Sequence, residues 1–506
     1  MSTIRFCGSS DGSKSLLEIM REKEYRIHAD CSGLGTCGKC RVRFISDTPK
    51  PTDTEKKHLS EKALSEGIRL ACQTKVSGDF TVEMDDLDDA MEIASIKGSY
   101  AEEIASIEGS DTEEIASIED SDVEVMPRNP VVAIDIGTTT LVAALLDPGR
   151  RKIIKAVTGV NHQRSFGADV ISRIQAANQG NGAELKELIH SDIRNLLSSL
   201  GVDETVPEII TANTTMQHLW QGLSCETLGV APYTPVDISC RTIEGCTLLP
   251  GISTYVGADI VSGIVAAKMD QSEKPCILID LGTNGEMAIG NRDKIMVAST
   301  AAGPAFEGGN ISCGTAGIPG AISGITIERG AIKYETIGGL TPVGLCGSGV
   351  VEIVYELLKE ELIDDIGLLD DAVDEDGFRI ADQVFFTQKD IREVQLAKAA
   401  IRAGLETLLQ AYGIGYDQVD TLYLAGGFGL KINLEKACAI GLLPRKLLNR
   451  TKAVGNTSLK GAALYAFDEG IRDRFIRVAS SSEEVSLADS GVFQEKYMEQ
   501  MYFETM

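Results

Sequence analysis

The spacing of apolar positions divides the chain into stretches of different secondary structure. Over residues 1–84 the pattern is mostly that of strands, with two short stretches of helical spacing between them. We expect strands over residues 3–7, 40–45 and 68–84, and helices over residues 15–20 and 52–64. This pattern predicts a small β-rich domain over residues 1–84.

Residues 85–128 have a different pattern. Between residues 85 and 124 there are fifteen Asp or Glu and one Lys, and the pentapeptide Glu-Ile-Ala-Ser-Ile recurs every eleven residues, from Glu92, Glu103 and Glu114. Eleven residues make three helical turns, which would keep the isoleucines on one face, but the acidic density, serines and glycines weaken an isolated helix. We expect an acidic linker that is a mobile tether, with a reach of about 35 Å. A solvated spacer without a binding role is the simpler alternative.

From residue 129 the chain alternates between strand and helix patterns. Two strand–turn–strand stretches, residues 131–146 and 276–289, resemble each other closely and suggest duplicated lobes. We therefore expect a two-lobed α/β unit with lobe 1 over residues 129–275, lobe 2 over residues 276–478, and a C-terminal extension over residues 479–506.

Composition excludes several classes of protein. With 506 residues and 43% apolar residues, the chain is long enough for several globular domains. Its formal charge of -27 argues against nucleic acid as a partner, because phosphates would be repelled. The longest apolar run is broken by polar residues, and no signal peptide is evident, so we expect no membrane association and a cytoplasmic protein with reduced cysteines.

Three cysteines share one glycine-rich turn and a fourth follows at a distance. The pattern is C-x5-C-x2-C, then thirty-one residues, then Cys; the four residues are Cys31, Cys37, Cys40 and Cys72. Four thiolates suit a [2Fe-2S] cluster, whose irons each take two sulfur ligands. The turn needs residues that accept positive φ and close backbone approach, and it contains Gly33, Gly35 and Gly38. A structural zinc site is the alternative, but such sites more often pair two C-x2-C knuckles.

The two similar hairpins carry the same polar residues where each first strand ends. An Asp there can hold Mg2+ or its water, a Gly lets a backbone N–H approach phosphate oxygens, and Thr or Asn side chains can donate to them. In the first hairpin these residues are Asp135, Gly137, Thr138, Thr139 and Thr140, and in the second they are Asp280, Gly282, Thr283 and Asn284. Two copies about 145 residues apart predict two lobes facing one nucleotide.

A third apolar strand ends in glycines ahead of a helix. Residues 422–425 are apolar and are followed by Gly426 and Gly427, which would let an adenosine lie against the backbone. These three pieces, in this order, resemble the ATP-binding fold shared by acetate and sugar kinases, actin and the heat-shock chaperone ATPases. By that resemblance the hairpins are two phosphate loops and Gly426-Gly427 is the adenosine loop.

Further stretches are similar to one family in particular, the reductive activators of corrinoid proteins. The resembling stretches are residues 33–42, 70–73, 135–140, 213–218, 257–260, 280–286, 301–308, 346–349, 395–400 and 426–429. The resemblance implies an α+β multidomain protein: an N-terminal β-grasp [2Fe-2S] ferredoxin followed by a two-lobed, actin-like (ribonuclease H-like) ATPase. It also implies that Gly303 contributes to cofactor binding, that Asp135 and Asp280 hold Mg2+, and that Glu286 positions the attacking water.

The function implied by the resemblance is ATP-dependent return of inactive Co(II) to Co(I) in a corrinoid protein of a methyltransferase system, in anaerobic metabolism. The electron would come from the cluster, which would be loaded by a donor such as a reduced ferredoxin or flavoprotein. The resemblance also suggests a homodimer.

Other functions remain open from the sequence. The fold alone permits a small-molecule kinase with a regulatory ferredoxin, or a nucleotide-gated binding protein whose cluster senses redox state. Activators of radical dehydratases also couple ATP to electrons, but they carry one [4Fe-4S] cluster shared across a dimer, which the four-cysteine pattern argues against.

Overall fold

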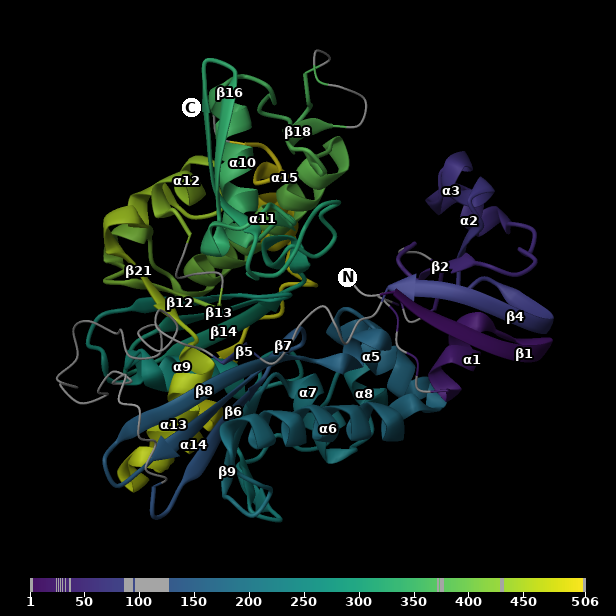
Figure 1. Cartoon of the computed structure of the whole chain (residues 1–506). Helices are drawn as coiled ribbons and strands as arrows, with labels where there is room; N and C mark the ends of the chain where they lie inside the picture. Colours follow the sequence, from purple (N-terminus) through teal and green to yellow (C-terminus); the bar gives the residue numbers. More distant parts are fainter. Residues whose placement is uncertain are drawn as a thin grey trace.

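The computed structural model describes residues 3–23, 25, 27, 29, 31, 33–35, 38–85, 94–95, 127–370, 373, 377–427 and 432–503. Figure 1 shows an N-terminal domain on one side and a larger two-lobed body on the other. In the described part of the chain no helix has the length and apolar character that a membrane span requires.

The N-terminal domain is a four-stranded sheet with short helices. The strand order is β1-β4-β2-β3, with β1 at Thr3–Ser15, β4 at Lys75–Asp85, β2 at Arg41–Phe44 and β3 at Ile68–Leu70. Helix α1 (Leu16–Glu22) begins at a capping box formed by Ser15 and Glu18, and it buries Leu16 and Met20 in the domain core. The expected β-rich domain is confirmed.

Two elements of this domain differ from the expectation. The helix expected over residues 52–64 is split into α2 (Asp53–His58) and α3 (Glu61–Ser65), because Ser60 caps a new helix by accepting from the Ala63 N–H. The strand expected over residues 68–84 is interrupted by a turn over residues 71–74, so Cys72 lies in a turn and not in a strand.

Lobes 1 and 2 repeat one sheet pattern. In lobe 1, strands β6 (Val131–Ile136), β7 (Thr140–Asp147) and β8 (Lys152–Val160) form an antiparallel meander, and β9 (Glu208–Ala212) pairs parallel to β6. In lobe 2, β12 (Cys276–Leu281), β13 (Gly285–Gly290) and β14 (Ile295–Thr300) form the same meander, and β20 (Leu422–Ala425) pairs parallel to β12. The duplication predicted from the two hairpins is therefore present.

Shorter strands complete the sheets. In lobe 1, β10 (Arg241–Ile243) and β11 (Cys246–Leu248) lie beyond β9, and β5 (Ala94–Ser95) pairs with β8. In lobe 2, β21 (Thr451–Gly455) lies beyond β20, and β22 (Glu483–Glu484) pairs with β14. Two smaller sheets are formed by β15 (Ala321–Glu328), β16 (Ala331–Thr336) and β17 (Gly344–Leu345), and by β18 (Phe378–Ala381) and β19 (Val384–Phe386). Strand β5 belongs to the first repeat of the predicted linker; the rest of that linker prediction, from residue 86 to 126, lies outside the described residues.

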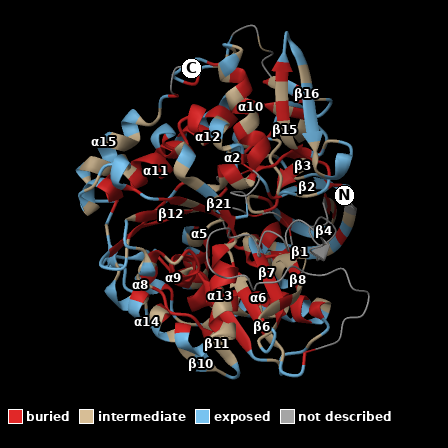
Figure 2. Cartoon of the chain, turned by 90° about the vertical axis from the view of Figure 1, so that its left-hand side faces the viewer, coloured by how far each residue is buried: buried red, intermediate tan, exposed pale blue. Residues whose placement is uncertain are grey.

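Helices cover both faces of each sheet, and the alternation along each strand explains why. On β12, Ile277 and Ile279 face one buried cluster while Cys276 and Leu278 face another. One face of the lobe 1 sheet packs on α5 (Val170–Ala176), α6 (Gly182–Leu200), α7 (Thr214–Gln221) and α8 (Glu226–Gly229). One face of the lobe 2 sheet packs on α10 (Gly347–Lys359), α11 (Gln388–Tyr412) and α12 (Leu434–Ala439). The buried layers appear in red in Figure 2.

The space between the two sheets is filled by helices from distant parts of the sequence. Helices α9 (Ala258–Ala266), α13 (Thr457–Phe467) and α14 (Arg472–Ser481) form one cluster with both sheets. Helix α13 packs on β6 and β9 although it follows lobe 2 in sequence. The chain therefore returns to lobe 1 near residue 457. The limits of the lobes, residues 129–275 and 276–478, remain a prediction.

The C-terminal extension is anchored by a buried lysine. Helix α15 (Gly491–Glu499) packs on α11, and the fully buried Lys398 donates from Nζ to the carbonyls of Gln500 and Tyr502, both at 2.7 Å. These bonds satisfy a buried ammonium group, so the segment from Gln500 to Tyr502 is fixed on α11.

Candidate functional site

Three carboxylates of the two hairpins and two from other elements form one electrostatic cluster. Asp135 lies on β6, Asp280 on β12 and Glu286 opposite Asp280 on β13, while Asp259 lies in the first turn of α9 and Glu307 ends a 3-10 turn (Pro304–Glu307). Burial raises the pKa of Asp280 to about 8 and that of Asp259 to about 7, and the neighbouring carboxylates add to both shifts. The pKa of Glu286 is also raised by burial, followed by repulsion from Asp259 and Asp280.

Asp135 is held by the start of α13. Its Oδ2 accepts from Asn456 Nδ2 at 2.7 Å and its Oδ1 from Ser458 Oγ at 2.9 Å. Burial raises the pKa of Asp135 and these two hydrogen bonds oppose the rise. The helix that crosses back from lobe 2 therefore orients the carboxylate of the first hairpin.

Glu307 joins the two predicted phosphate loops. Its Oε2 accepts from Thr283 Oγ1 at 2.7 Å and from Thr139 Oγ1 at 3.2 Å, and these two hydroxyls lie 3.3 Å apart. Hydroxyls that donate to a carboxylate in this way could donate equally to a phosphate oxygen. The structure thus brings together the two threonines that the sequence predicted as phosphate ligands.

The backbone of the first predicted phosphate loop is held by hydrogen bonds from buried side chains. The fully buried Arg173 donates to the Thr138 carbonyl at 2.5 Å, and Asn161 Nδ2 donates to the Gly137 carbonyl at 2.9 Å. The Thr138 hydroxyl accepts from Asn213 Nδ2 at 3.0 Å. Thr140 begins β7 with an exposed side chain. These contacts hold the backbone of the first loop in place.

The second loop and the predicted adenosine loop touch. Gly426 has φ of 97°, and a Cβ there would lie 2.5 Å from the Leu281 carbonyl oxygen and 2.9 Å from Asp280 Oδ1. Only glycine fits this approach, whereas Gly427 and Gly303 face open space. In the second loop, the Gly282 N–H donates to the Asn284 carbonyl, and Asn284 Nδ2 donates to Glu286 Oε1 at 3.1 Å.

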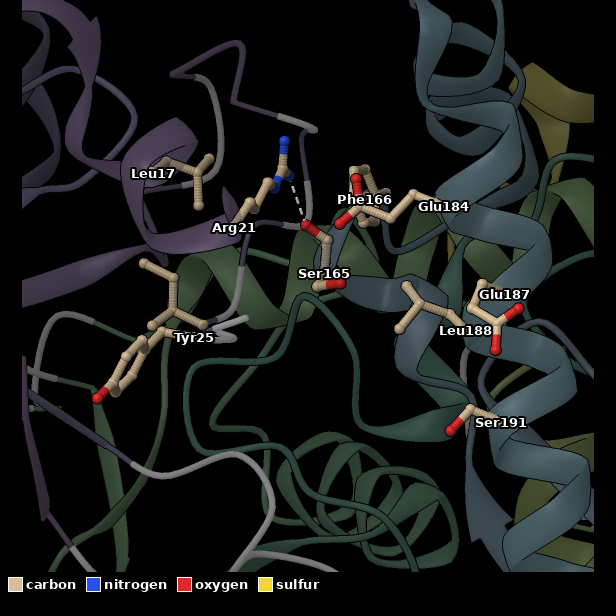
Figure 3. Close-up of a pocket in the computed structure, with 10 residues that line it drawn as sticks. Leu17, Arg21, Tyr25, Ser165, Phe166, Glu184, Glu187, Leu188 and Ser191 are labelled. Atoms are coloured by element: carbon tan, nitrogen blue, oxygen red, sulfur yellow. Dashed lines mark hydrogen bonds between the residues drawn. The ribbon is translucent and has the colours of Figure 1, made fainter. Parts of the chain in front are cut away.

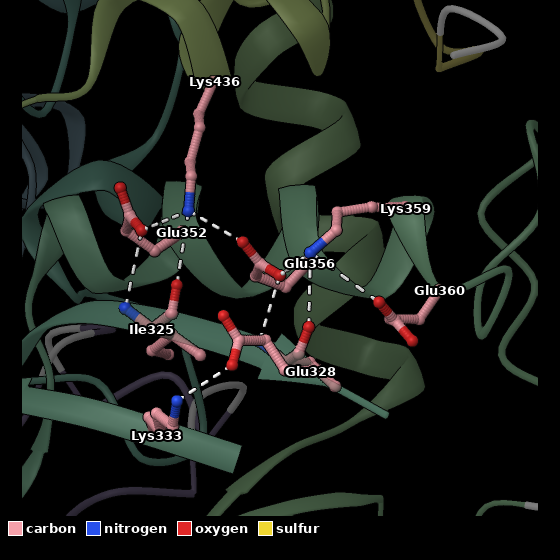
Figure 4. A network of polar contacts seen from close by, with 9 residues as sticks. Ile325, Glu328, Lys333, Glu352, Glu356, Lys359, Glu360 and Lys436 are labelled. Atoms are coloured by element: carbon pink, nitrogen blue, oxygen red, sulfur yellow. Dashed lines mark hydrogen bonds and ion pairs between the residues drawn. The ribbon is translucent and has the colours of Figure 1, made fainter. Parts of the chain in front are cut away.

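A partly buried ion-pair network anchors the helix that follows the predicted adenosine loop (Figure 4). Lys436, in α12, contacts Glu352 at 2.6 Å and Glu356 at 2.8 Å, both on α10, and donates to the Ile325 carbonyl on β15. Removing Lys436 would leave two partly buried carboxylates without their partner, so this network holds α12 on α10 and β15.

The oxygen-rich cleft suits Mg2+. Mg2+ is usually held by one or two carboxylates together with water and substrate phosphates, so a preformed cage is not required. Among the residues that the structure describes, no three His, Cys, Asp or Glu side chains form a group that could hold a metal ion. A cation would also lower the raised pKa values of the cleft carboxylates by offsetting their mutual repulsion.

Three of the four predicted cluster ligands lie in the described residues, and Cys37 lies outside them. The Sγ atoms of Cys40 and Cys72 are 3.3 Å apart, and Cys31 is close enough to act on the pKa of Cys72. That pKa is lowered to about 7, chiefly by the hydrogen bond with Cys40. The loop glycines adopt positive φ as predicted, at 92°, 78° and 67° for Gly33, Gly35 and Gly38. Adjacent thiols in such a loop fit a metal–sulfur cluster.

Comparisons with known proteins agree with this geometry. Family models match in succession: a 2Fe-2S iron-sulfur cluster binding domain over residues 5–77, the RACo middle region over residues 131–272, and the C-terminal domain of RACo, the ASKHA domain, over residues 274–506. The corrinoid activation enzyme RamQ of Eubacterium limosum is 35% identical over 418 residues, which cover 72% of this chain and 69% of RamQ. This chain belongs to the family of corrinoid reductive activators.

Other members of the family extend the likeness. The Co(II) methylated amine-specific corrinoid protein reductase of Methanosarcina barkeri is 25% identical over 417 residues, covering 72% of this chain and 76% of that protein. A solved structure of a reductive activator for a corrinoid, iron-sulfur protein aligns with a TM-score of 0.71 at 27% identity, covering 98% of this chain and 96% of the other. The expected ferredoxin and actin-like ATPase architecture of a reductive activator is thus confirmed.

The sequence of this reductive activator did not predict a role for several residues around the five carboxylates. Asp259 and Glu307 lie in stretches that carried the resemblance, but no role was predicted for either. Arg173 and Asn161 gave no signal, because each is a single polar residue in an ordinary helix or loop pattern. His218, on α7, is hydrogen-bonded within lobe 1: its Nε2 accepts from the Val236 N–H and its Nδ1 contacts the Thr214 carbonyl.

Proposed function

We propose that this protein reactivates a corrinoid protein of a methyltransferase system by ATP-dependent transfer of one electron, converting Co(II) to Co(I). The observation that carries the proposal is the contact of Glu307 with both Thr139 and Thr283, which joins the phosphate loops of two lobes in a chain that also carries the cysteine loop. Membership of the family of corrinoid reductive activators is the reason for proposing that cobalt is reduced.

The proposed roles in the cleft follow from its donors and acceptors. Asp135 and Asp280 hold Mg2+, while hydroxyl, amide and backbone groups of both hairpins hold the phosphates: Gly137, Thr138, Thr139, Thr140, Gly282, Thr283 and Asn284. Gly303, Gly426 and Gly427 are proposed to lie against the nucleotide through their backbone. Glu286 and Glu307 are the two carboxylates proposed to orient the water that attacks the terminal phosphate.

The four cysteines hold the cluster, which when bound supplies the single electron at a potential of about -400 mV for the plant type. Reduction of a corrinoid to Co(I) requires a lower reduction potential than this. We therefore propose that ATP hydrolysis supplies the missing free energy. Closure of the two lobes on ATP would bind the corrinoid protein in a form that accepts the electron more readily. The proposal also includes a reduced ferredoxin or flavoprotein as donor, a cytoplasmic location and a homodimer.

The test is the ATP-dependent reduction of cobalt, followed by the absorbance of the corrinoid under anaerobic conditions with a chemical reductant. We expect conversion of Co(II) to Co(I) that requires both ATP and a loaded cluster. Phosphate transfer to an added sugar or acetate would instead indicate a kinase. A purified protein without iron and sulfide would contradict the proposal.

A further inference from the structure

The N-terminal domain contacts lobe 1 through one arginine. Arg21, on α1, donates from Nη2 to the carbonyl of Ser165 at 2.5 Å, and its guanidinium carbon lies 4.3 Å from the centroid of the Phe166 ring (Figure 3). Ser165 ends a 3-10 turn, η1 (His162–Ser165), which precedes α5. The contact therefore joins two segments that are 144 residues apart in the sequence.

The interface around this contact is not closely packed. A cavity of about 280 Å³ lies between the two domains. It is lined on one side by Leu17, Tyr25 and Ile27 and on the other by Glu184, Glu187 and Leu188 of α6. Where the walls of this cavity do not touch, the two domains make no packing contacts, so the cavity reduces the area over which they pack on each other.

Electrostatics adds to the role of Arg21. Burial lowers the pKa of Arg21, and the Glu184 carboxylate is the charge that opposes this shift most. The next charges in order are Cys40 and Cys72, two of the predicted cluster ligands. The Arg21 guanidinium is therefore close to two regions: helix α6 of lobe 1, and the cysteines that are predicted to hold the cluster.

The 3-10 turn η1, which Arg21 contacts, is hydrogen-bonded to the predicted first phosphate loop. Asn161 caps η1, its backbone N–H donates to the Thr139 carbonyl at 3.0 Å, and its side chain donates to the Gly137 carbonyl at 2.9 Å. Arg173 connects the two segments a second time, because it bonds the carbonyls of both Thr138 and Gly167. A shift of the loop on binding a phosphate would therefore displace the Ser165 carbonyl.

We propose that Arg21 is a positioning residue that docks the cluster-bearing domain on η1 and makes this docking responsive to occupation of the first phosphate loop. The inference rests on the proposed function in one respect: residues 137–140 are taken to bind the phosphates of ATP. The docking itself is a property of the protein without its corrinoid partner, so it is testable alone.

The experiment is hydrogen exchange of the full-length, cluster-loaded protein, read by mass spectrometry at α1 and at residues 161–167. In Arg21→Gln, without nucleotide, we expect roughly tenfold faster exchange at both segments, as for the loss of a charge-assisted hydrogen bond. In the unaltered protein, Mg-ATP or a non-hydrolysable analogue should change exchange at both segments. In Arg21→Gln the nucleotide effect should remain at residues 161–167 and disappear from α1.

The matched control is Arg5→Gln, which removes an exposed arginine of the same domain that pairs with Glu83 on the sheet. It should behave as the unaltered protein does. Phe166→Leu is a second variant, since it keeps a buried apolar side chain but removes the ring beneath Arg21. It should give the same changes in smaller degree.

Two results would overturn the inference. One is that the nucleotide does not change hydrogen exchange at α1 of the unaltered protein. The other is that the nucleotide still changes hydrogen exchange at α1 of Arg21→Gln. Failure of the proposed function looks different. A protein that shows the Arg21-dependent response but never reduces cobalt keeps the docking inference and loses the function, and a protein that reduces cobalt without the response does the reverse.

Discussion

At the scale of single residues, Glu307 is the side chain whose role the structure changes most. It is a partly buried carboxylate that accepts from the hydroxyls of Thr139 and Thr283, which are the donors proposed to bind a phosphate. Burial raises the pKa of Glu307, and the two hydroxyls oppose this rise. A phosphate oxygen and this carboxylate therefore compete for the same donors.

We expect Glu307→Gln to bind ATP several-fold more tightly, because one negative charge beside the phosphates is removed. If the carboxylate also orients the attacking water, ATP hydrolysis should fall by about 100-fold or more. Nucleotide titration and phosphate release measure the two effects separately. Glu286→Gln is the comparison: a loss of hydrolysis in that variant alone would return the water-positioning role to Glu286.

At the scale of elements, α2 and the turn that carries Cys72 depend on one buried side chain. Glu55 is fully buried; its Oε1 accepts from the Leu70 N–H at 2.8 Å and from Thr74 Oγ1 at 2.9 Å. Its Oε2 accepts from the Thr52 N–H at 2.7 Å, which closes the capping box of α2.

Glu55→Ala would remove the acceptor of the Leu70 and Thr52 N–H groups, while the Thr74 hydroxyl would keep its bond to the Leu70 carbonyl, at a cost of roughly 3 kcal/mol. We expect the variant to lose its cluster at a lower temperature, seen as earlier bleaching of the visible absorbance on heating. Glu61→Ala removes an exposed glutamate from the next helix and is the control. Equal bleaching temperatures for the two variants would show that Glu55 does not support the turn.

Strand β9 contains a glutamate that makes lobe 1 less stable at neutral pH than at pH 4.5. Burial raises the pKa of Glu208 from 4.5 to about 7, so the folded chain holds a proton that the unfolded chain releases between these values. Folding takes up a proton in that window, and stability therefore falls as pH rises from about 4.5 to 7.

Glu208→Gln stays neutral and should raise the free energy of unfolding of lobe 1 by about 2 kcal/mol at pH 8, with little effect at pH 4.5. Urea titrations followed by the single tryptophan, Trp220, report on this lobe, because Trp220 packs in its core on α7. The exposed Glu226→Gln should show no such dependence on pH. A gain that is equal at both pH values would point to packing and not to the proton.

Local patterns predicted the elements better than their breaks and contacts. The hairpins of Asp135 and Asp280 were predictable, because strand alternation and turn residues are encoded within about fifteen neighbouring positions. The break at Ser60 was missed because helical spacing continues across it, although a serine is a good cap. The approach of Glu307 to Thr139 was not predictable, because it depends on how the two lobes pack.

At the scale of the whole molecule, the proposed electron-transfer and nucleotide-binding functions belong to separate parts of the sequence that are in contact in space. The cysteine loop and the nucleotide cleft belong to different domains, and the contact of Arg21 with Ser165 lies between them. No pattern in the sequence predicts this docking, since a lone arginine on a short helix has the same appearance as a solvated one. The acidic linker remains a prediction, apart from the pairing of β5 with β8.

This division of labour predicts opposite defects in two variants. Cys72→Ser removes a predicted cluster ligand in the N-terminal domain and should abolish cobalt reduction while leaving ATP binding within about twofold of normal. Asp280→Ala removes the cleft carboxylate that lies against Gly426 and should abolish ATP hydrolysis while leaving iron content and visible absorbance unchanged. The measurements are iron and sulfide content, phosphate release and cobalt reduction on each variant. If Asp280→Ala reduced cobalt at the normal rate, ATP would not drive the reaction; if Cys72→Ser did so, the electron would not pass through the cysteine loop.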